Sequence, residues 1–224
     1  MHPPPDLALY FVTDTGLCRP RPVADVVRAA VAGGARTVQV RDKDAGRREL
    51  LELTRAVLGA VAGVPGVTVV VNDAVDVALI TGADGVHVGQ DDLPVTEVRR
   101  LMGPDRLVGL SVSSPAELDV ALALPEGTVD LVGIGPFRGT PTKPDAGLPL
   151  GPGGVAELAA AARAAGLATV AIGGIDAANA AEVAATGVDG ICVVSALCTA
   201  EDPAATARTL RAAFESGRAR VAAP

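Results

Sequence analysis

The chain has 224 residues, a formal net charge of −7 and only 2% aromatic residues. This length provides for one large core, while the acidic balance and the scarcity of aromatic side chains argue against a nucleic-acid-binding surface. The longest uncharged stretch, residues 56–72, is interrupted by Gly63, Pro65 and Gly66. We therefore expect no membrane-spanning helix.

The first residues and the cysteines both favour a cytoplasmic location. Residues 1–6 lack the basic start and the apolar stretch of a signal peptide. Cys18, Cys192 and Cys198 do not have the paired spacing of metal ligands. We expect them to be free thiols in a reducing compartment.

Runs rich in Val and Ile alternate with segments of helical periodicity along the whole chain. The predicted strands cover residues 7–13, 37–42, 67–72, 85–89, 107–112, 130–135, 168–173 and 190–194. The predicted helices cover residues 22–33, 46–62, 74–82, 94–102, 114–124, 151–165, 176–186 and 202–216. This pattern predicts an α/β protein, a single (β/α)8 TIM barrel over residues 1–224, with residues 217–224 as a frayed tail.

An open doubly wound sheet is the alternative arrangement. Its nucleotide-binding form carries a G-x-G-x-x-G turn after the first strand, and residues 14–18 have no such pattern. In a barrel, the polar clusters that follow the strands all lie at one end, where barrel enzymes have their active sites.

A cationic cluster ends the second predicted strand. Gln39, Arg41 and Lys43 are spaced by two, which points their side chains to one face of a strand and Asp42 to the other. The two cations suit a phosphate or diphosphate at the barrel mouth. The alternative is a strand end with solvated charges.

Two carboxylates belong to the next two predicted strands. Asp73 ends the third strand and Asp92 follows the fourth, so a barrel brings them close together. Mg²⁺ is commonly held by one or two carboxylates together with substrate phosphates, and we expect Mg²⁺ here. Each aspartate alone is equally suited to cap the helix that follows it.

Later loops add groups that suit an anionic ligand. Segment 140–143, on the long loop 137–149, offers two hydroxyls and an ammonium group. Gly174 after the seventh strand and Ser195 after the eighth lie where barrels often bind phosphate. His87 should point into the barrel, as a core residue or as a residue that supports the site.

As a set, these motifs resemble one family, the thiamine-phosphate synthases, in family order over nearly the whole chain. The matching segments are Gln39-Val40-Arg41-Asp42-Lys43, Asn72-Asp73, His87-Val88-Gly89-Gln90-Asp91-Asp92, Gly109-Leu110-Ser111, Gly135-Pro136, Thr140-Pro141-Thr142-Lys143-Pro144-Asp145, Ala171-Ile172-Gly173-Gly174-Ile175 and Val193-Val194-Ser195-Ala196. The resemblance implies that a hydroxymethylpyrimidine diphosphate loses pyrophosphate and that the ring nitrogen of a thiazole phosphate takes its place, giving thiamine phosphate. It also implies a pyrimidine carbocation, which requires no strong general base.

By matched position, the resemblance implies three groups of site residues. The pyrimidine diphosphate would be held by Gln39, Val40, Arg41, Asp42, Lys43, Asn72, Ser111 and Lys143. The thiazole phosphate would be held by Thr140, Pro141, Thr142, Gly174, Val194 and Ser195. Mg²⁺ would be held by Asp73 and Asp92. Residues expected to act in catalysis, by stabilising the charge on the leaving pyrophosphate, are Arg41, Lys43, Ser111 and Lys143.

Three other functions stay open from the sequence. A related group on the same barrel isomerises a thiazole carboxylate phosphate, but it tends to lose the diphosphate and metal residues that are present here. A phosphosugar isomerase would need an acid–base pair, and a non-catalytic phosphate sensor would not need Asp73 and Asp92. We expect small-molecule substrates, no nucleic-acid or membrane partner, and leave a homo-oligomer open.

Overall fold

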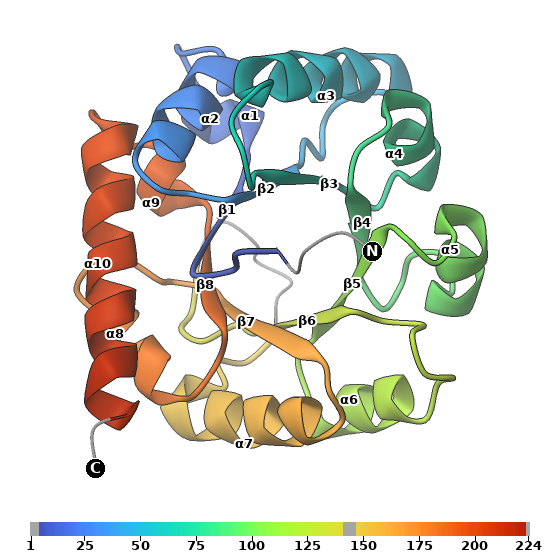
Figure 1. The fold of residues 1–224 in the computed structure, drawn as a ribbon, viewed down its shortest axis with the longest axis vertical. Helices are drawn as coiled ribbons and strands as arrows, with labels where there is room; N and C mark the ends of the chain where they lie inside the picture. Colours follow the sequence, from blue (N-terminus) through green and yellow to red (C-terminus); the bar gives the residue numbers. More distant parts are fainter. Residues whose placement is uncertain (1–4, 141–146, 223–224) are drawn as a thin grey trace.

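Eight parallel strands close into a barrel in chain order, and helices surround it as a ring (Figure 1). The computed structural model describes residues 5–140 and 147–222. Its strands are β1 (Leu9–Val12), β2 (Thr37–Val40), β3 (Thr68–Asn72), β4 (Gly85–Val88), β5 (Leu107–Val112), β6 (Leu131–Ile134), β7 (Ala168–Ile172) and β8 (Gly190–Val193). β1 pairs with β8, with Tyr10 opposite Cys192, and this pairing closes the barrel. The predicted TIM barrel is confirmed.

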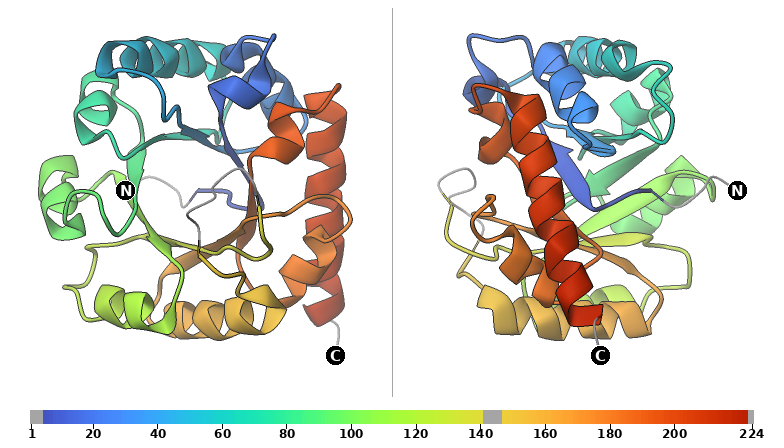
Figure 2. Two further views of the ribbon diagram at one scale, coloured as in Figure 1. Left: turned by 180° about the vertical axis from the view of Figure 1, so that it is seen from behind. Right: turned by 60° about the vertical axis from the view of Figure 1, so that its left-hand side comes forward.

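The helices lie outside the barrel, and the longest of them runs across its outer surface beside α8 (Figure 2). They are α1 (Thr15–Cys18), α2 (Val23–Ala32), α3 (Arg47–Val61), α4 (Val75–Thr81), α5 (Val95–Met102), α6 (Pro115–Leu122), α7 (Gly151–Ala164), α8 (Ala180–Ala185), α9 (Ser195–Cys198) and α10 (Pro203–Ala222). Helices α1 and α9 are single turns that the sequence did not predict. Within the described ranges, no helix has the length and apolar character needed to cross a bilayer.

Alternate residues of each strand face two different apolar regions. One region fills the barrel and includes Tyr10, Val70 and Leu131. The other lies between the barrel and the helices and includes Phe11 and Val71. The single tyrosine and the three phenylalanines are all buried, so the remainder of the core is built mainly from Val, Leu, Ile and Ala.

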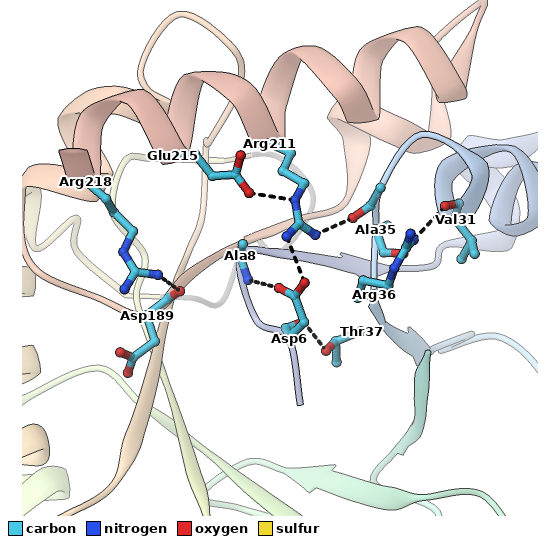
Figure 3. Close-up of polar contacts among 11 residues, drawn as sticks. Asp6, Ala8, Val31, Ala35, Arg36, Thr37, Asp189, Arg211, Glu215 and Arg218 are labelled. Carbon is cyan, nitrogen blue, oxygen red and sulfur yellow. Dashed lines mark hydrogen bonds and ion pairs between the residues drawn. The ribbon is translucent and has the colours of Figure 1, made fainter. Parts of the chain in front are cut away.

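The N-terminal segment is fastened where the strands begin, at the end of the barrel opposite the site described below. Asp6 Oδ2 accepts a hydrogen bond from Arg211 Nη2 of α10 at 2.8 Å, and its backbone oxygen accepts one from Thr37 Oγ1 at 2.8 Å (Figure 3). Arg211 also donates to the backbone oxygen of Gly34 and to Glu215. One arginine thus joins α10 to the start of the chain and to the turn before β2.

Helix α10 continues to Ala222, so the predicted frayed tail is wrong for residues 217–222. A Cβ at Gly217 would lie 2.6 Å from the backbone oxygen of Ala181, and the absence of a side chain allows α10 to pack closely on α8. Arg218 lies over the Phe214 ring at 5.9 Å and donates to the backbone oxygen of Asp189 at 3.4 Å. These tertiary contacts stabilise the last turns of α10, in a segment for which the sequence alone did not predict a helix.

Candidate active site

A cavity of about 360 Å³ opens at the C-terminal ends of the strands. All eight strands, or the loops that follow them, contribute to its lining. The predicted site residues in the lining are Gln39, Arg41, Lys43, Asn72, Asp73, Asp92, Ser111, Thr140, Gly174, Val194 and Ser195. The barrel therefore brings together groups that lie far apart in the sequence.

The other predicted residues have different positions. Val40 is fully buried in the core between β2 and the helices, because it alternates with Gln39 and Arg41 along the chain. Asp42 lies outside the cavity lining, and its Oδ1 accepts a hydrogen bond from the backbone N–H of Asp44 at 3.1 Å. Pro141, Thr142 and Lys143 lie outside the described residues.

Asp73 and Asp92 form an acidic pair beside the cationic end of β2. Burial, followed by the neighbouring Asp92 carboxylate, raises the pKa of Asp73 to about 6, while Asn72 and Lys43 act in the opposite direction. Asp92 Oδ2 accepts a hydrogen bond from the backbone N–H of Gly89 at 2.8 Å, which fixes this carboxylate. Two facing carboxylates, of which Asp73 has a raised pKa, are a suitable pair of ligands for a divalent cation.

His87 lies inside the barrel as predicted, and its ring occupies space left by two glycines. A Cβ at Gly109 would lie 2.3 Å from His87 Nδ1, and one at Gly133 would lie 3.1 Å from Cε1. His87 Nε2 is 3.1 Å from Ser111 Oγ, within hydrogen-bonding distance. The histidine therefore supports the position of the Ser111 hydroxyl at the cavity.

The loops after β7 and β8 form the side of the cavity that suits a phosphate. Gly173 and Gly174 have φ angles of 102° and 61°, in the left-handed region that favours glycine. A Cβ at Gly174 would lie 2.9 Å from Arg138 Cβ, so this glycine also leaves room for the segment after β6. Helix α9 begins at Ser195 in the cavity lining, and the first N–H groups of a helix have no partner within it.

Several lining residues were not identified from the sequence. Tyr10 is fully buried, and its hydroxyl accepts a hydrogen bond from Gln39 Nε2 at 2.9 Å. Glu117 accepts hydrogen bonds from both the backbone N–H and the hydroxyl of Ser113, at 2.7 and 2.8 Å. The only available signal for Tyr10 was its alternation along β1, which places it inside the barrel. Glu117 lies in the first turn of the predicted helix 114–124, and this position did not indicate a site residue.

Known proteins that are similar to this chain share one family. The family model of thiamine monophosphate synthase matches residues 9–197. A thiamine-phosphate synthase of Azorhizobium caulinodans is 45% identical over 96% of this chain and 98% of its own length. One of Solidesulfovibrio magneticus is 50% identical over 97% of this chain and 100% of its own length.

A solved structure shares the architecture as well. The thiamine phosphate pyrophosphorylase of Pyrococcus furiosus superposes with a TM-score of 0.82 and 34% sequence identity, covering 95% of this chain and 97% of that one. By its sequence and its fold, the chain belongs to the thiamine monophosphate synthase family.

Proposed function

We propose that this cavity joins a hydroxymethylpyrimidine diphosphate to a thiazole phosphate, releasing thiamine phosphate and pyrophosphate, with Mg²⁺ held by Asp73 and Asp92. One observation carries the proposal: two different anion-binding arrangements share a single cavity. Cations and carboxylates follow β2 to β4, while glycines and a helix start follow β7 and β8, across the barrel (Figure 1). Two anionic substrates can therefore lie side by side.

The side formed by β2 to β5 suits the diphosphate. Arg41 offers a planar, permanently charged guanidinium, and Lys43 adds an exposed ammonium. Asn72 and Ser111 contribute neutral hydrogen-bonding groups to the same lining. Lys143 is the third proposed cation, and it lies outside the described residues.

The acidic pair suits Mg²⁺. In the part of the chain that the structure describes, no group of three or more His, Cys, Asp or Glu side chains is placed to hold a metal ion. Two carboxylates match the way in which Mg²⁺ is usually held, with water and substrate phosphate oxygens completing the shell. When bound, the ion would neutralise charge on the leaving diphosphate. Asp73 and Asp92 would fix it next to Lys43.

The side formed by β7 and β8 suits the thiazole phosphate. The start of α9 presents backbone N–H groups and the Ser195 hydroxyl, and Gly174 lies in the same part of the lining. Thr140 lines the cavity near these loops. A monophosphate here would direct the attached thiazole ring toward the centre of the barrel mouth.

The bond changes need no proton transfer. The bond between the pyrimidine methylene carbon and the diphosphate oxygen breaks, and its electron pair leaves with pyrophosphate. The lone pair of the thiazole nitrogen forms the new carbon–nitrogen bond. No proton moves in this step, so Arg41, Lys43 and Ser111 act by stabilising charge rather than as a general base.

The proposal extends to partners and compartment. Both substrates are small phosphorylated molecules, and no nucleic acid or membrane is among the proposed partners. Cys18, Cys192 and Cys198 are free and buried, which is in keeping with a reducing compartment. We place the reaction in the cytoplasm.

The test is product formation by the purified chain. With both substrates and Mg²⁺, ³¹P NMR should show equal amounts of pyrophosphate and thiamine phosphate. Excess chelator should abolish the signal, and Asp92→Asn should lower turnover about 10- to 100-fold. Asp105→Asn, an exposed aspartate in the turn before β5, is the matched control and should behave as wild type.

Two results would overturn parts of this proposal. Full activity in excess chelator would remove the metal assignment. Isomerisation of a thiazole carboxylate phosphate, with no use of the pyrimidine diphosphate, would assign the chain to the other reaction of this barrel.

A further inference from the structure

Asp14 contacts Arg41, one of the two cations of the site, from outside the cavity lining. It follows β1 and lies outside the cavity lining, so it does not face the substrates itself. Its Oδ2 is 3.5 Å from Arg41 Nη1, and the two side chains are 26% and 12% exposed. Its Oδ1 accepts a hydrogen bond from the backbone N–H of Leu17 at 3.0 Å, which caps α1. The two carboxylate oxygens therefore have separate partners.

The residue before Asp14 fixes the backbone of the same arginine. Thr13 is fully buried, and its Oγ1 accepts from the N–H of Arg41 at 2.9 Å and donates to the Arg41 carbonyl at 3.1 Å. The backbone N–H of Thr13 donates to the Gln39 carbonyl at 2.9 Å. Consecutive residues of one segment thus hold both the backbone and the guanidinium of Arg41.

We propose that Asp14 is a positioning residue that holds the Arg41 guanidinium in the orientation needed to receive the diphosphate. This inference deepens the proposed function and rests on it. An arginine side chain has several freely rotating bonds, and fixing it in advance removes an entropic cost from substrate binding and from the transition state. Asp14 Oδ2 lies beside one guanidinium nitrogen, Nη1, and the guanidinium has further N–H donors that can bind the ligand.

The competing explanation is that Asp14 only caps α1. Asp14→Asn separates the two roles, because its Oδ1 can still accept from Leu17 while the charge opposite Arg41 is lost. Asp14→Ala removes both the cap and the charge. Asp25→Asn is the matched control, since Asp25 pairs with Arg28 at 2.6 Å on α2 with both side chains more than half exposed.

The experiment measures kcat and KM for each substrate, and the melting temperature, in all three variants. Asp14→Asn should lower kcat/KM for the pyrimidine diphosphate about tenfold, leave KM for the thiazole phosphate unchanged and keep the melting temperature of wild type. Asp14→Ala should show the same kinetic loss and also melt at a lower temperature. Asp25→Asn should match wild type throughout.

A second measurement tests whether Asp14 acts through Arg41. Calorimetry with inorganic pyrophosphate and Mg²⁺ should show weaker binding for Asp14→Asn than for wild type. In an Arg41→Met background, the further change Asp14→Asn should have no effect on that binding.

The outcomes that overturn the inference are distinct. Four results would each contradict the positioning role and leave Asp14 as a helix cap alone. They are unchanged kinetics in Asp14→Asn, an equal kinetic loss for both substrates, an effect of Asp14→Asn that persists without Arg41, and a melting temperature of Asp14→Asn as low as that of Asp14→Ala. Failure of the proposed function is a different result, because the wild-type chain would then make no thiamine phosphate.

Discussion

At the scale of single residues, both the backbone conformation of Asp73 and the ionisation of its carboxyl group are unfavourable when no metal is bound. Its φ of 57° lies in the left-handed region, where it is the one non-glycine residue among those described. Burial and Asp92 raise its pKa from the ordinary value of 3.8 to about 6. Such costs are common at functional sites, where the required group is retained at the expense of stability.

The change Asp73→Asn should therefore stabilise the metal-free protein while abolishing product formation. Because the folded-state pKa lies above the unfolded one, the cost of ionising Asp73 is fully present above about pH 6 and absent below about pH 4. After allowance for partial exposure, the gain at pH 7.5 should be about 1–2 kcal/mol. Urea denaturation at pH 7.5 and pH 4 measures it, and an equal gain at both pH values would contradict the electrostatic explanation.

Sequence reasoning identified residues well where a local rule applied. The spacing of two, from β2 into the segment that follows it, correctly predicted that Gln39, Arg41 and Lys43 line the cavity. The same rule explains why Val40 is in the core instead. Asp14 was not identified as a partner of Arg41, because that pairing depends on how β1 and β2 lie side by side. Neither strand carries a local signal for this contact.

At the scale of elements, the single turns α1 and α9 were not predicted because four residues are too few to show a helical period. The eight strands and the longer helices were predicted within a few residues of their observed bounds, since repeated Val-rich runs and helical periodicity are strong signals. The predicted end of α10 was wrong because the contacts of its last turns with α8 and Asp189 are tertiary, and the local sequence does not indicate them.

A further prediction concerns the contacts that Arg211 of α10 makes with the start of the chain. Arg211→Ala should lower the free energy of unfolding by about 2 kcal/mol, because it removes charge-assisted bonds to Asp6 and Glu215 and one to a backbone carbonyl. Kinetic constants should not change, since these contacts lie at the strand starts, away from the cavity.

Arg208→Ala is the matched control for this prediction. Arg208 is exposed on the same helix, and its removal should change stability by less than about 0.5 kcal/mol. Chemical denaturation and steady-state kinetics of both variants provide the test. Loss of activity in folded Arg211→Ala, or equal destabilisation by the two changes, would show that this cluster does not act as described.

At the scale of the whole molecule, the parallel barrel converts sequence order into a shared site. Strand ends from β1 to β8 surround one cavity, so the topology alone explains why residues from Tyr10 to Ser195 meet. The sequence motifs predicted that these residues share one site. The division of the cavity into two halves depended on the resemblance and on the observed positions of the loops, because no local pattern states which loops face each other.

The most direct test of this division is calorimetric titration of each substrate separately, with Mg²⁺, into Asp92→Asn and Ser195→Ala. Asp92→Asn should weaken the pyrimidine diphosphate about 10- to 100-fold and leave the thiazole phosphate unchanged. Ser195→Ala should weaken the thiazole phosphate about 5- to 10-fold and leave the pyrimidine diphosphate unchanged. If each variant instead loses the other ligand, or both ligands equally, the two-sided cavity described here is contradicted.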